Sequence, residues 1–157
     1  MTINITILTQ GSRGDVQPYV ALGTGLKNAG YHVSMPAPEV FRHLISDAGI
    51  EFIPSHGFDP QEFIRSPEIQ TAARQRGQLK TLALLLRKAG PLLEGIFDEY
   101  WRTSASADIL IASTLVFGMA DCAEKRGIPL INAPIHAMLI PTRAFPATFF
   151  APWGTRE

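Results

Sequence analysis

A single carboxylate, Asp15, stands on a glycine-bracketed loop between an apolar run and a helical pattern. Residues 3–9 are rich in β-branched side chains and predict a strand, which breaks at Gly11-Ser12-Arg13-Gly14-Asp15 before helical spacing begins. In open α/β folds such loops lie at the carboxyl edge of the sheet, where ligands bind. The pattern therefore predicts an active-site loop with one acid or base group.

One carboxylate limits the chemistry of this loop. Glycoside hydrolysis generally uses a pair of carboxyl groups. A lone base suits a reaction in which an incoming hydroxyl loses its proton while a good leaving group departs unaided. Glycosyl transfer from a nucleotide sugar is such a reaction.

Two other nucleotide-binding motifs fit the loop poorly. A P-loop requires GxxxxGK[ST], and no Lys-Ser or Lys-Thr pair follows Gly14. A dinucleotide fingerprint requires GxGxxG and an acidic residue that closes the second strand. Here the spacing is Gly11-x-x-Gly14, and the second strand ends in Ser34-Met35-Pro36-Ala37. The sequence excludes the P-loop and disfavours an NAD-dependent oxidoreductase.

A structural role for Asp15 competes with the catalytic one. As a helix N-cap, its carboxylate would accept a hydrogen bond from the Gln17 amide, and this alone would explain an aspartate. The helix dipole also stabilises the charged carboxylate and so weakens it as a base, whereas an apolar acceptor site would oppose that effect. Both interpretations stay open at the level of sequence.

Composition excludes several function classes. The 157 residues suffice for one domain, and 46% hydrophobic with 18% charged residues is typical of a globular protein. A formal net charge of zero disfavours nucleic acid as a partner. The single cysteine, Cys122, rules out an internal disulfide and predicts a buried thiol. We expect a cytoplasmic protein without a metal site.

The remaining elements predict an α/β fold. Periodicity and glycine or proline breaks predict, after the first strand, helix 16–29, strand 31–35, helix 38–48, strand 51–53, strand 108–112, helix 115–126 and strand 129–132. This alternation predicts a Rossmann-like, mainly parallel sheet with helices on both faces. Gly23 and Gly25 predict close packing of the first helix on the sheet. We expect a single domain over 1–157, with a helical insertion at about 55–107 and a loop or linker tail from about 133.

The insertion carries a cluster of basic residues at Arg74, Arg76, Lys80, Arg87 and Lys88, with no acidic residue between them. Leucines between 79 and 86 give the same segment an apolar side. The cluster is either the solvated side of a core-facing helix or a peripheral contact with an anionic membrane.

Two stretches carry a likeness to a known family. They read Gly11-Ser12-Arg13-Gly14-Asp15-Val16-Gln17-Pro18-Tyr19-Val20-Ala21-Leu22-Gly23 and Leu26-Lys27-Asn28-Ala29-Gly30-Tyr31-His32-Val33. The likeness continues through Phe41, Gly49-Ile50-Glu51-Phe52, residues 123–129 and residues 141–146. Together these residues resemble the opening of sterol glucosyltransferases and of related GT-B glycosyltransferases that act on lipids and antibiotic aglycones.

The resemblance implies the acceptor half of a two-domain GT-B enzyme. It implies that Asp15 takes the proton of the acceptor hydroxyl in an inverting, metal-independent transfer, and that Gly11, Ser12, Arg13 and Gly14 lie near the donor. UDP-glucose is the implied donor; it is a co-substrate, and no cofactor is expected. The donor domain is absent from the 157 residues, so we expect the chain alone to be inactive and to need that domain in cis or in trans.

The implied acceptor is a lipophilic, sterol-like alcohol. Its contacts are expected from the tail, at His136, Met138, Leu139, Phe145 and Phe149, although His136 equally fits a loop histidine bonded to the backbone. Family members with a histidine base carry an orienting aspartate after the fourth strand, where this chain has Ser113-Thr114-Leu115. With Asp15 as the base, no orienting group is needed. The alternative is a non-catalytic module that binds a hydrophobic ligand.

Overall fold

A computed structural model describes residues 2–55, 67, 94–113, 116 and 118–135. Its centre is a five-stranded sheet in the order β3-β2-β1-β4-β5, in which every neighbouring pair is parallel. The strands are β1 (Asn4–Leu8), β2 (His32–Ala37), β3 (Glu51–Pro54), β4 (Ile109–Ala112) and β5 (Leu130–Asn132). The predicted parallel α/β architecture is confirmed.

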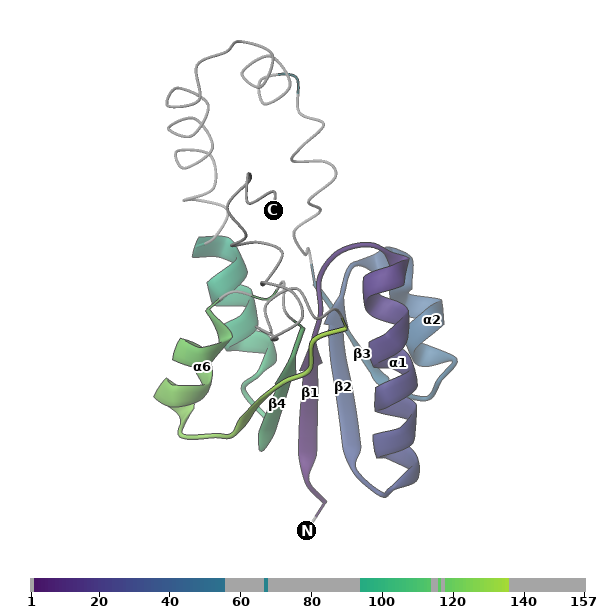
Figure 1. Ribbon diagram of the computed structural model, residues 1–157, viewed down its shortest axis with the longest axis horizontal. Helices are drawn as coiled ribbons and strands as arrows, with labels where there is room; N and C mark the ends of the chain where they lie inside the picture. Colours follow the sequence, from purple (N-terminus) through teal and green to yellow (C-terminus); the bar gives the residue numbers. More distant parts are fainter. Residues whose placement is uncertain (1, 56–66, 68–93, 114–115, 117, 136–157) are drawn as a thin grey trace, which may run out of the picture.

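Helices cover both faces of this sheet, as Figure 1 shows. One layer holds α1 (Arg13–Asn28), the 3-10 turn η1 (Glu39–Phe41) and α2 (Arg42–Ser46). The other holds α6 (Met119–Arg126) and the helical residues 94–103. The predicted helical insertion at about 55–107 falls largely outside the described residues. Within the described part of the chain, no helix has the length and apolar character needed to cross a bilayer.

Several element boundaries differ from the prediction. The helix predicted from Leu115 begins only at Met119, because Gly118 has a φ of 78° and lies in the left-handed region. The predicted helix 38–48 divides into η1 and the five-residue α2. Strand β2 continues past the predicted end at residue 35, through Pro36 to Ala37. Because β1 pairs with β2 only as far as Ser34, the missing N–H of Pro36 costs no hydrogen bond to β1.

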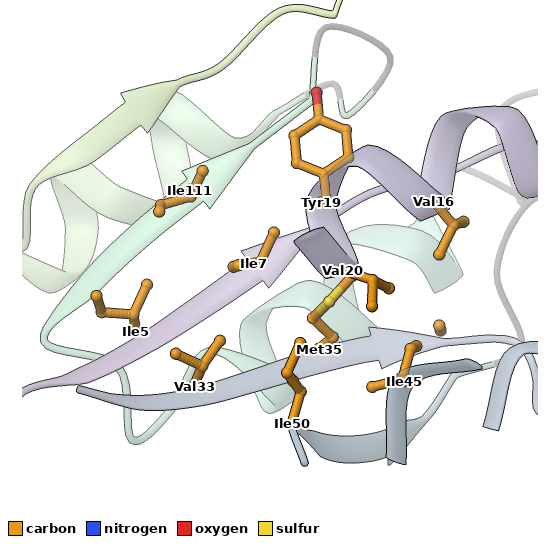
Figure 2. Packing of buried hydrophobic residues seen from close by; sticks show 11 residues of the cluster. Ile5, Ile7, Val16, Tyr19, Val20, Val33, Met35, Ile45, Ile50 and Ile111 are labelled. Atoms are coloured by element: carbon orange, nitrogen blue, oxygen red, sulfur yellow. The ribbon is translucent and has the colours of Figure 1, made fainter. Parts of the chain in front are cut away.

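Alternating side chains of the central strands build two hydrophobic cores. Ile5 and Ile7 of β1 face the α1 layer, where they join Tyr19, Val20 and Met35 (Figure 2). Leu8 of β1 and Leu110 of β4 belong to the core under α6. The period of two fixes which layer each residue serves. The central strands β1, β2 and β4 are thus buried on both faces, as expected of a parallel sheet, whereas β5 carries exposed side chains.

Glycine and cysteine positions test three further expectations. A Cβ on Gly23 would lie 2.7 Å from Ile50 Cδ1, so a close approach of α1 to the sheet is confirmed there. The same expectation is wrong for Gly25, which would meet nothing within 4 Å because it faces away from the sheet. Cys122 is 8% exposed, and its thiol lies 3.8 Å from the Ser104 hydroxyl. The buried thiol is confirmed.

Candidate functional site at the sheet's carboxyl edge

The Asp15 loop lies where the strand order of the sheet reverses. From β1 the chain continues to β2 and β3 on one side, whereas β4 and β5 lie on the other side. The amide of Ser113, just after β4, donates to the Leu8 carbonyl at the end of β1 (3.0 Å), so the two strand ends meet at this point. Such a switch point forms the crevice in which open α/β folds bind ligands.

Ser12, and not Asp15, is the N-cap of α1. Ser12 has extended backbone angles, and its carbonyl accepts from the amides of Asp15 (2.9 Å) and Val16 (3.1 Å). Asp15 is the third helical residue, and its Oδ2 atom accepts from the Ser12 amide (2.7 Å) and the Ser12 hydroxyl (2.9 Å). The expected hydrogen bond from the Gln17 amide to an N-cap aspartate is therefore wrong. The carboxylate instead closes a capping box with Ser12.

Gly11 provides the space that the carboxylate occupies. Its φ of +116° is open to glycine and strained for other residues. A Cβ at this position would stand 2.4 Å from Asp15 Oδ2 and 2.9 Å from its Cγ. The first glycine of the loop thus lets the chain pass directly beneath the Asp15 side chain.

The two oxygens of Asp15 differ in their environment. Both hydrogen bonds go to Oδ2, and among the described residues none reaches Oδ1. The residue is half-buried, while Ser12, Arg13 and Gly14 are exposed around it. Among the described residues, Arg13 Nε donates one long hydrogen bond, to Gln17 Oε1 (3.4 Å). Ser12 thus holds one carboxylate oxygen, and the other has no hydrogen-bond partner among the described residues.

Buried polar contacts support the loop from below. The Thr9 hydroxyl donates to the Asp15 carbonyl (3.2 Å), and Gln10 Nε2 donates to the hydroxyl of Tyr100. One helical turn after Asp15, the hydroxyl of Tyr19 donates to the Ala133 carbonyl after β5. Burial raises the pKa of the Tyr19 phenol, and the negative charge of Asp15 raises that pKa further.

Sequence reasoning found Asp15 and its glycines but missed their supports. The i, i+4 spacing of Asp15 and Tyr19 places both side chains on one helix face, and this signal was available in the sequence. Gln10 and Tyr100 are 90 positions apart, and no spacing rule links them.

The remaining predicted site residues lie outside the described residues. These are the acceptor contacts His136, Met138, Leu139, Phe145 and Phe149, and the basic cluster Arg74, Arg76, Lys80, Arg87 and Lys88. Over the described ranges, no three His, Cys, Asp or Glu side chains gather so as to hold a metal ion.

The chain is similar in sequence to two sugar transferases. Over 151 residues the chain is 36% identical to a sterol 3-beta-glucosyltransferase of Debaryomyces hansenii, covering 96% of the chain and 9% of that relative. Over 114 residues it is 37% identical to the O-mycaminosyltylonolide 6-deoxyallosyltransferase of Streptomyces fradiae, covering 72% of the chain and 27% of that relative. The chain therefore spans well under a third of the length of either protein.

The fold also has solved counterparts. The glycotransferase of kitacinnamycin superposes with a TM-score of 0.59 at 19% identity, over 85% of this chain and 30% of that one. This likeness concerns the fold alone. Residues 5–141 match the glycosyltransferase family 28 N-terminal domain. With the parallel sheet and the Asp15 loop at its switch point, this match shows that the chain belongs to glycosyltransferase family 28 as an N-terminal domain of the GT-B type.

Proposed function

We propose that the chain is the acceptor-binding half of an inverting glycosyltransferase that glycosylates a hydroxyl of a lipophilic, sterol-like acceptor. Family membership supports sugar transfer. The names of the relatives support a sterol or another large aglycone as acceptor and, for the Debaryomyces hansenii relative, glucose as the sugar. A uridine nucleotide as the donor carrier follows from the family resemblance.

The geometry of Asp15 carries the proposal. Ser12 holds Oδ2 through two hydrogen bonds, and Oδ1 has no hydrogen-bond partner among the described residues. In the proposed step, Oδ1 takes the proton of the acceptor hydroxyl while the acceptor oxygen attacks the anomeric carbon of the sugar. The bond from this carbon to the nucleotide phosphate breaks as the new bond forms, so the configuration inverts. Asp15 supplies general-base catalysis, an effect of about 10²–10⁴-fold in rate.

The residues before Asp15 suit the donor side of the site. Gly11, Ser12, Arg13 and Gly14 precede or open the first turn of α1, where the helix dipole favours a phosphate. The Arg13 guanidinium is exposed at the same place. The rest of the donor site belongs to a second domain, in cis or in trans, and we propose that the chain alone does not transfer sugar.

A transfer assay tests this division of labour. Radiolabelled UDP-glucose is offered with a 3-hydroxysterol to the chain alone, to a donor domain alone and to the two joined. We expect glycoside only from the joined protein, with the anomeric proton showing inversion by NMR. Tight sterol binding by the chain without transfer by any joined form would instead favour the non-catalytic binding module.

Two further parts of the proposal concern residues 74–88 and the tail. We propose that Arg74, Arg76, Lys80, Arg87 and Lys88 bring a cytoplasmic enzyme to an anionic membrane surface. Co-sedimentation with phosphatidylserine vesicles should then weaken steeply with salt. Salt-independent binding, or none, would contradict the membrane contact.

Alanine at Phe145 or Phe149 should raise the acceptor KM with little effect on kcat if the tail contacts the acceptor.

A further inference from the structure

One buried side-chain hydrogen bond joins the Asp15 loop to the opposite helical layer. Gln10 Nε2 in the β1–α1 loop donates to the hydroxyl of Tyr100 in the helical residues 94–103. Gln10 is 9% exposed and Tyr100 is 4% exposed. Asp15 is on α1, which packs on one face of the sheet, whereas Tyr100 belongs to the core on the other face. The bond therefore crosses the carboxyl edge of the sheet.

The flexible residue of the loop lies directly beside this bond. Gly11 follows Gln10, has the positive φ and supports the Asp15 carboxylate. Ser12 follows Gly11 and donates both hydrogen bonds to Oδ2. A glycine linker leaves the Ser12–Asp15 pair free to shift unless the residue before it is fixed. The Tyr100 hydroxyl provides that fixed point.

Tyr100 is itself held independently of its hydroxyl. Its side chain belongs to the buried core under α6, together with Leu8, Leu110 and Met119. Burial also raises the pKa of Tyr100, so the phenol keeps its proton at alkaline pH values where a free tyrosine would lose it. Removing only the hydroxyl should leave the ring in place and the Gln10 amide without its buried partner.

We infer that the Gln10–Tyr100 hydrogen bond positions the β1–α1 loop and, through Gly11 and Ser12, the Asp15 carboxylate for proton abstraction. Gln10 and Tyr100 are positioning residues, because both act through the loop. The catalytic part of the inference rests on the proposed function, whereas the positioning of the loop rests on geometry alone.

Amide hydrogen exchange at Ser12 tests the positioning directly in the 157-residue chain. The Ser12 amide donates to Asp15 Oδ2, so its protection reports how well the pair is held. We expect Tyr100→Phe and Gln10→Met each to speed this exchange about five-fold, the effect of one lost hydrogen bond. The double variant should exchange no faster than either single variant, because both remove the same bond.

Thr103→Val is the matched control. It removes another buried hydroxyl of the same helix, one that donates to the Glu99 carbonyl (2.8 Å) and, within the described part of the chain, has no hydrogen bond to the loop. We expect Ser12 exchange to stay at the wild-type rate in this variant. Wild-type exchange in both Tyr100→Phe and Gln10→Met, or equal acceleration by Thr103→Val, would overturn the positioning role.

The catalytic consequence is measured in the chain joined to its donor domain. Tyr100→Phe should lower kcat about ten-fold with the acceptor KM within about two-fold of wild type, because a misplaced base slows chemistry more than binding. An unchanged kcat despite faster Ser12 exchange would overturn the catalytic part. Wild-type kcat in Asp15→Asn would instead sink the proposed function, and the exchange result would still decide the positioning.

Discussion

Alanine at Gly11 is the sharpest test of how the Asp15 side chain is seated. The substitution places a Cβ 2.4 Å from Asp15 Oδ2 and requires a non-glycine residue at a φ of +116°. Backbone strain of this kind costs about 1–2 kcal/mol. Displacing the half-exposed carboxylate from Ser12 adds about 1 kcal/mol, the typical loss of a helix cap. The free energy of unfolding should fall by about 2–3 kcal/mol.

Urea denaturation followed by circular dichroism measures this change, with Gly25→Ala as the matched control. Gly25 lies in the same helix as Asp15, and a Cβ there would meet nothing within 4 Å. Alanine at Gly25 should therefore stabilise the chain by about 0.5–1 kcal/mol through helix propensity. The two chemically identical substitutions are expected to act in opposite directions.

A double-mutant cycle isolates the contact with Asp15. In an Asp15→Ala background the new methyl group meets no carboxylate, so Gly11→Ala should cost about 1 kcal/mol less than in the wild type. A Gly11→Ala protein as stable as wild type would refute both the backbone strain at Gly11 and the close contact with Asp15. A cost identical in both backgrounds would refute the claim that the carboxylate lies over Gly11.

Three further predictions follow from the packing. Gly23→Ala should lower the free energy of unfolding by about 1–3 kcal/mol, because its methyl would lie 2.7 Å from Ile50 Cδ1. A variant more stable than wild type in a urea titration would contradict that close approach. Burial raises the pKa of Tyr100, so the unfolded chain loses the phenol proton at a lower pH than the folded chain does, and the free energy of unfolding should decline as the pH rises above about 10. Thermal melting measured at several pH values should show a shallower decline in Tyr100→Phe. Equal slopes in the two proteins would contradict the burial of the phenol. Cys122 should react slowly with a thiol reagent in the native chain and rapidly in urea, whereas fast native labelling would show an open thiol.

The sequence predicted the sheet because its signals are local. Short runs rich in β-branched and other apolar residues, bounded by glycine, proline or polar residues, place the strands within a residue or two. The ends of an element were less predictable where a single backbone angle determines at which residue a helix begins. Gly118 delays α6 by four residues relative to the prediction, and the left-handed φ responsible for this is a property of the folded loop.

The candidate site likewise has a part that the sequence predicts and a part that only the folded structure determines. The Asp15 loop was predictable because its glycines, serine and carboxylate are adjacent in sequence. The identity of the N-cap was not, because Ser12 and Asp15 both favour helix starts and the folded backbone decides between them. The Gln10–Tyr100 bond depends on a contact between residues 90 positions apart, which only the packing of the two helical layers on the sheet creates.

The most direct test of the account is the turnover of Asp15→Asn in the chain joined to its donor domain. The amide keeps the size of the side chain and an oxygen that can accept from Ser12, so folding and acceptor binding should persist. We expect kcat to fall about 10²–10⁴-fold, with acceptor affinity within about two-fold of wild type. Asp47→Asn, at an exposed carboxylate after α2, should leave kcat unchanged. A kcat for Asp15→Asn within about three-fold of wild type would contradict the assignment of Asp15 as the base.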